Sequence, residues 1–227
     1  MRCFLVITAL LLIMSAVNCS AEEKIPVYVS ILPQKYFVER IGGDRVDVEV
    51  MVLPGANPAT YEPRPSQMKK MASVKLYYSI GVPFEDVWLE RIAAMNRKMQ
   101  IVHTDAGIEK IAITGHHHHD EEEGHGHEED HGGRPDPHIW LSPSLVKKQA
   151  KVVLESLREL DPANRASYEQ GYDDFVHDID QVDGELKTKL EGLNKRFMVF
   201  HPSWGYFAHE YGLEQVAAEV EGKEPKP

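Results

Sequence analysis

Cysteine is almost absent from this sequence: among 227 residues only Cys3 and Cys19 occur, both within the first 21 positions. Residues 1–21 have the pattern of an export signal, with a basic start, an apolar run and small residues before a cleavage point after Ala21. Cleavage there leaves no cysteine, which excludes a disulfide, a thiolate metal site and a thiol nucleophile. We therefore expect a periplasmic protein. Lipid anchoring at Cys19 is less favoured, because Asn18 occupies a position where lipoprotein processing prefers a small residue.

Basic residues are also scarce relative to acidic ones, with 25 Lys and Arg against 36 Asp and Glu, a net charge of -11. This negative net charge argues against a nucleic-acid partner and is compatible with the binding of cations. The apolar run of the export signal is too short for a membrane span. An HExxH motif or a comparable paired metalloenzyme motif is missing as well, which disfavours a hydrolytic metalloenzyme with a metal-bound water and a general base.

Strand and helix patterns alternate along the first part of the exported chain. Apolar residues with strand-like patterning occupy 25–31, 46–52, 76–80 and 100–103, and helical periodicity occupies 33–41, 66–73 and 84–95. Such alternation predicts an α/β lobe with a mainly parallel sheet. We assign residues 22–141 to this N-terminal lobe.

A helical segment at 142–195 follows. Ser142 and Pro143 provide a cap and a first-turn proline for a helix over 142–160, and a long charged helix is expected over 164–193. Strand, helix and strand patterns then return at 196–200, 205–211 and 215–218. Residues 196–227 thus read as the start of a second α/β lobe, which this chain leaves incomplete.

Residues 115–133 form an acidic, histidine-rich stretch without apolar side chains, expected to be a solvated loop. Its histidines suit weak metal capture as an accessory site; the alternative is a solvated loop without any metal role. They are His116, His117, His118, His119, His125, His127 and His131.

Two other histidines are held by bulky or rigid neighbours. His138 stands in the run Asp-Pro-His-Ile-Trp at 136–140, and His201 begins His-Pro-Ser-Trp at 201–204. Zinc takes neutral imidazole nitrogens in a tetrahedral set, so ligands must converge from different loops. From the residues alone, a metal pair and two hydrogen-bonded loop histidines are equally good interpretations. His103, His177 and His209 lack a motif and are expected at the surface.

Several of these motifs together resemble one family. The loop PGANPATYEP at 54–63, the acidic histidine-rich loop, DPHIW at 136–140, FHPSWGYF at 200–207 and EGKEP at 221–225 resemble the metal-binding receptors of bacterial zinc and manganese ABC importers. The resemblance implies two Rossmann-like lobes joined by a long helix, with the metal in the cleft between them. It further implies that His138 and His201 are primary ligands for Zn(II), with Mn(II) as an alternative, and that the protein is a monomer which delivers metal to a membrane permease.

The sequence departs from the family pattern at two places. Zinc members bind the ion with three histidines and a carboxylate, and the first histidine normally stands where this chain has Ala59. Glu62 and Asn57 are the candidate oxygen ligands that could substitute near that position. The fourth ligand comes from later in the second lobe than this chain extends.

An alternative function is a periplasmic zinc buffer or chaperone that acts through the histidine-rich loop alone. The receptor predicts one tightly bound ion that needs both lobes, whereas the buffer predicts several weak ions that survive the loss of His138. Neither hypothesis involves a catalytic residue.

Overall fold

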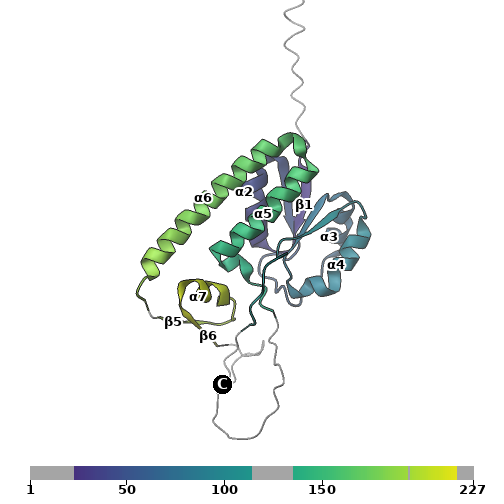
Figure 1. Ribbon diagram of the computed structural model, residues 1–227. Helices are drawn as coiled ribbons and strands as arrows, with labels where there is room; N and C mark the ends of the chain where they lie inside the picture. Colours follow the sequence, from purple (N-terminus) through teal and green to yellow (C-terminus); the bar gives the residue numbers. More distant parts are fainter. Residues whose placement is uncertain (1–22, 114–134, 194, 219–227) are drawn as a thin grey trace, which may run out of the picture.

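The first lobe, which contains β1 in Figure 1, is built on a parallel sheet of four strands. The strand order in this sheet is β2-β1-β3-β4. Its strands are β1 (Ile25–Val29), β2 (Val46–Val50), β3 (Leu76–Ser79) and β4 (Gln100–His103), and every neighbouring pair is parallel. The computed structural model describes residues 23–113, 135–193 and 195–218. The expected export signal and the histidine-rich loop lie outside these residues.

Helices cover both faces of this sheet (Figure 1). One face packs on α2 (Leu32–Gly42), α5 (Pro143–Leu160) and α6 (Arg165–Leu190), and the other on α3 (Pro65–Lys70) and α4 (Pro83–Met95). Leu76 and Tyr78 of β3 enter the first cluster, and Tyr77 between them enters the second. This alternation follows from the two-residue period of a strand, and a sheet buried on both faces is typical of α/β proteins.

Helix α5 starts where its sequence predicts. The Ser142 hydroxyl accepts the Leu145 N–H at 3.3 Å, and Pro143 occupies the first turn, where its missing N–H is not needed. A short 3-10 turn, Ile139–Leu141, directly precedes this cap. The segment that carries His138 is therefore fixed at its end by a helix start.

Helix α6 is the longest element, with 26 residues and a length of about 39 Å. Its first half lies against the end of α2 at Gly171, where a Cβ would come within 2.6 Å of the Ile41 carbonyl oxygen. Only a glycine permits this approach. Beyond Ile179 the apolar stripe leaves the core, and Val182 is 54% exposed. The helix ends at Leu190 instead of residue 193, since the chain turns at Gly192 with a φ of 69°.

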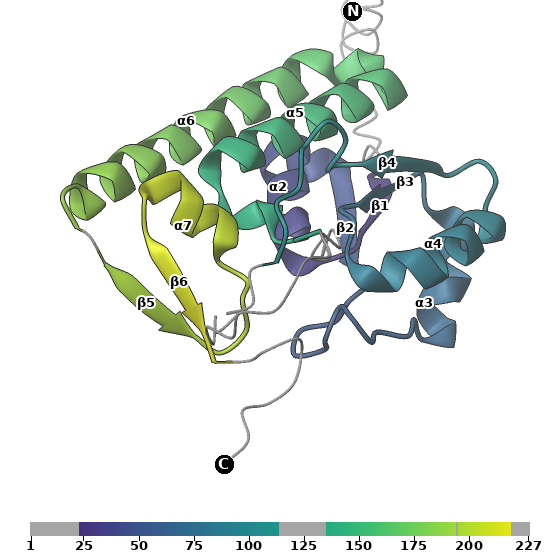
Figure 2. The same ribbon diagram turned by 60° about the horizontal axis from the view of Figure 1, so that its bottom comes forward.

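A second α/β unit lies at the far end of α6 (Figure 2). It consists of β5 (Arg196–Val199), α7 (Gly205–Tyr211) and β6 (Glu214–Ala217), and its two strands pair in parallel. The expected strand-helix-strand order in the last described part of the chain is thereby confirmed. Within the residues described, no helix has both the length and the apolar character needed to cross a membrane.

Candidate metal centre

His138 is held between rigid and apolar neighbours at the approach to α5. Pro137 precedes it, Ile139 is completely buried, and the Trp140 ring lies 5.0 Å from the imidazole, measured between ring centroids. The His138 side chain is only 13% exposed. Its neighbours thus restrict the ring to one place at the surface of the first lobe.

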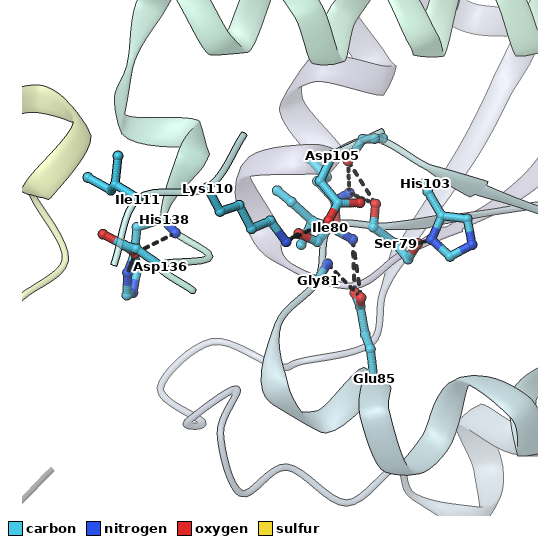
Figure 3. A network of polar contacts seen from close by, with 12 residues as sticks. Ser79, Ile80, Gly81, Glu85, His103, Asp105, Lys110, Ile111, Asp136 and His138 are labelled. Atoms are coloured by element: carbon cyan, nitrogen blue, oxygen red, sulfur yellow. Dashed lines mark hydrogen bonds and ion pairs between the residues drawn. The ribbon is translucent and has the colours of Figure 1, made fainter. Parts of the chain in front are cut away.

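Asp136 orients this imidazole (Figure 3). Its carboxylate oxygen Oδ1 lies 2.6 Å from His138 Nδ1 and also accepts the backbone N–H of His138 at 2.9 Å. The Asp136 side chain is 2% exposed, so water competes little for it. A carboxylate acceptor selects the tautomer with the proton on Nδ1, which leaves the lone pair of Nε2 available to a metal.

His201 comes from the other side, on the loop between β5 and α7. Its ring centroid is 5.3 Å from that of His138, with an angle of 69° between the planes. Two imidazoles on one tetrahedral zinc, each with a Zn–N distance of about 2.0–2.1 Å, have centroids about 5 Å apart. The spacing of this pair therefore fits a shared ion.

A third ligand does not join the pair within the described part of the chain. No group of three or more His, Cys, Asp or Glu side chains is placed there to hold a metal. Ala59 and Glu62 are exposed, and the Asn57 side-chain oxygen accepts the Ala59 N–H at 2.8 Å. The structure thus brings together His138 and His201, but does not bring Glu62 to them.

A second polar network lies at the carboxyl ends of β3 and β4 (Figure 3). The buried Glu85 carboxylate accepts N–H groups from Ile80 at 3.0 Å and Gly81 at 2.7 Å, and burial raises its pKa above the usual range. Lys110 contacts the Ile80 carbonyl at 3.2 Å and Asp105 at 2.5 Å. These contacts fix the segment that runs on to Ile111, which pairs with Asp136.

The other histidines in the described part of the chain have no comparable setting. His103 bonds through Nδ1 to the Ser79 hydroxyl at 2.8 Å, and the ring is otherwise exposed, as are His177 and His209. Their expected surface positions are confirmed. The seven histidines at 116–131 lie outside the described residues.

Sequence reasoning did not assign roles to three residues around the pair. Asp136 orients His138, while Tyr206 and Glu210 of α7 contact residues on either side of it. The two-residue spacing of Asp136 and His138 across a proline is a local signal for the first contact. The other two join residues about 70 positions apart, and no local pattern marks such contacts.

The protein has two α/β units, each with a parallel sheet, and a long helix joins them. This architecture is that of a two-lobed solute-binding protein. The family described as zinc-uptake complex component A, periplasmic (ZnuA), matches residues 27–227. The chain belongs to this family. Members of this family are metal-binding substrate-binding proteins of transport systems, not enzymes.

Individual relatives agree with this assignment. The high-affinity zinc uptake system protein ZnuA of Yersinia pestis is 26% identical over 88% of this chain and 67% of its own length. The zinc-binding protein AdcA of Streptococcus pyogenes serotype M3 is 26% identical over 87% of this chain, which spans only 40% of that relative. A crystal structure of ZnuA is 40% identical with a TM-score of 0.78, covering 90% of this chain and 74% of the other.

Proposed function

We propose that this protein captures Zn(II) in the periplasm between His138 and His201 and delivers it to the membrane permease of an ABC importer. The observation that carries the proposal is the 5.3 Å spacing of two imidazoles, one of which is oriented by a buried carboxylate. Family membership supports zinc uptake as the setting. Export follows cleavage of residues 1–21, and the chain acts as a monomer.

Binding in this account involves no chemical step. The Asp136 carboxylate holds the His138 ring with Nε2 outward, so the ion meets a ligand that needs no reorientation. His201, on the other side of the site, completes the pair. Imidazole ligands favour zinc, whereas oxygen ligands from Glu62 or Asn57 at the remaining positions would shift preference toward Mn(II). The boundaries 22–141, 142–195 and 196–227 are proposed as first lobe, helical segment and second lobe.

The histidine-rich loop has an accessory role in this proposal. Its seven imidazoles collect metal weakly and raise the local supply of ions for the pair. The rival function is a zinc buffer in which the same loop is the whole metal-binding device. The two functions differ in which residues hold the tightest ion.

A calorimetric zinc titration separates them. Deletion of residues 115–132 is expected to remove weak sites and keep the tightest one, while His138→Ala and His201→Ala weaken the tightest one. His177→Ala is the matched control, since that imidazole is exposed on α6 and distant in sequence from both ligands. Loss of the tightest site on loop deletion, with His138→Ala behaving as wild type, would establish the buffer instead.

A further inference from the structure

Helix α7 carries two side chains, one turn apart, that contact the chain on both sides of His138. The first is Tyr206, whose hydroxyl donates to the Asp136 carbonyl oxygen at 2.7 Å and accepts the Ile111 N–H at 3.2 Å. Asp136 itself donates its N–H to the Ile111 carbonyl at 2.8 Å. One phenol from the second unit therefore links two segments of the first lobe beside the orienting carboxylate.

The second side chain is Glu210. Its carboxylate accepts the Ser142 hydroxyl and, at 3.3 Å, the Ser144 N–H, both at the start of α5. Ser142 lies four residues after His138, as the cap of that helix. The short segment that holds His138 is thus bonded to α7 at both of its ends.

The Tyr206 hydroxyl makes its two hydrogen bonds in a buried environment. The residue is 6% exposed within the apolar cluster that also contains Ile139, and burial raises its pKa to about 12. The phenol therefore stays protonated and donates at neutral pH. Gly205 permits the approach, since a Cβ there would lie 3.1 Å from Asp136 Oδ2 and 3.3 Å from the Ile111 side chain.

We propose that Tyr206 and Glu210 are positioning residues that set the spacing and ring orientation of His138 and His201. His201 stands four residues before α7 and is followed by the buried Pro202, so a shift of α7 moves it directly. The same shift breaks the hydrogen bond from Tyr206 to the Asp136 carbonyl oxygen. The Asp136 carboxylate, which orients His138, is then held less firmly. This inference rests on the proposed function, in which the two imidazoles share one ion.

The first test uses metal-free protein, so it is independent of zinc binding. Long-range proton–nitrogen NMR at pH 8 reports the His138 tautomer: wild type should have the proton on Nδ1, and Asp136→Asn should lose this preference. Tyr206→Phe is expected to shift His138 toward the Nε2-protonated form and to speed exchange of the Ile111 amide by about fivefold, as for one lost hydrogen bond. A tautomer and exchange rate unchanged from wild type would overturn the positioning role.

The second test measures zinc affinity by competition with a chelator. Tyr206→Phe and Glu210→Gln should each weaken zinc binding by about fivefold. Gly205→Ala should also weaken zinc binding, and it replaces Tyr206→Phe in the test if that variant folds poorly. Tyr211→Phe is the matched control, because its hydroxyl bonds Asp183 of α6 at 2.9 Å and should leave the affinity unchanged.

The outcomes keep the two proposals apart. Wild-type protein without a tight zinc site would refute the proposed function, whatever the variants do. Tight binding by wild type together with equal affinities for Tyr206→Phe, Glu210→Gln and Gly205→Ala would refute the positioning role alone. A drop with Tyr211→Phe as large as with Tyr206→Phe would also refute it, because general loosening of α7 would then explain the effect.

Discussion

At the scale of single residues, the resemblance of the motifs predicts a histidine ligand at the position where this chain has Ala59. The loop around Ala59 is nevertheless tied to the first lobe. Tyr61 donates to the Gln67 side chain at 2.8 Å, Gln67 donates to the Met51 carbonyl at 2.7 Å, and the Phe84 N–H bonds the Pro58 carbonyl at 3.1 Å. These anchors lie on both sides of Ala59, so a new side chain there starts from a held backbone.

Ala59→His is therefore expected to add a third imidazole to His138 and His201. A third ligand completes most of a tetrahedral zinc shell and should tighten zinc binding about tenfold or more, which is about 1.4 kcal/mol, with selectivity moving from manganese to zinc. The zinc affinities of wild type and Ala59→His are measured by competition titration with a zinc chelator at fixed pH, with His138→Ala as control. Equal affinities would show that position 59 does not face the ion.

At the scale of elements, the corner between α5 and α6 depends on one carboxylate. Asp161 accepts the Tyr168 hydroxyl at 2.6 Å and the Asn164 side-chain amide at 2.7 Å. The hydrogen bond from Tyr168, with that from Asn164, holds the pKa of Asp161 below its usual range. Since Tyr168 is completely buried, this bond anchors the start of the long helix.

The lowered pKa gives a pH-dependent prediction. A carboxylate whose pKa is lower in the folded than in the unfolded state stabilises the folded protein at pH values above its unfolded pKa of about 3.9. This stabilisation disappears as the pH falls through the pKa of the folded state. Asp161→Asn should lower the free energy of unfolding by about 1 kcal/mol at pH 7, a modest value because water still reaches the carboxylate. The difference from wild type should shrink below pH 3.

Urea unfolding at pH 7 and at pH 2.5 measures this difference. Asp173→Asn, an exposed aspartate on α6, is the matched control and should match wild type at both values. A loss for Asp161→Asn that is equally large at both pH values would mean that the ionised carboxylate is not the stabilising form.

The elements were largely predictable from the sequence because their signals are local. Period-two and helical patterns placed the strands and helices, and Ser142 with Pro143 marked the start of α5 correctly. The end of α6 was missed by three residues, since the charged pattern continues past Leu190 and only the turn at Gly192 stops the helix. The contacts of Tyr206 and Glu210 depend on how α7 packs on the first lobe, which no local pattern determines.

At the scale of the whole molecule, each of the two α/β units contributes one histidine to the candidate metal centre. The first lobe supplies His138 with its orienting Asp136, and the second supplies His201 at the entrance to α7. The resemblance of the motifs pointed to both residues, and the structure brings their rings together. The lobe boundaries and the roles of the loop histidines stay predictions.

Native mass spectrometry after exposure to an equimolar mixture of zinc and manganese tests the central claim most directly. The account predicts one retained zinc ion per chain, which persists when residues 115–132 are deleted and is lost when His138→Ala and His201→Ala are combined. Several retained ions that all disappear with the loop, or a zinc ion retained by the double variant, would contradict it.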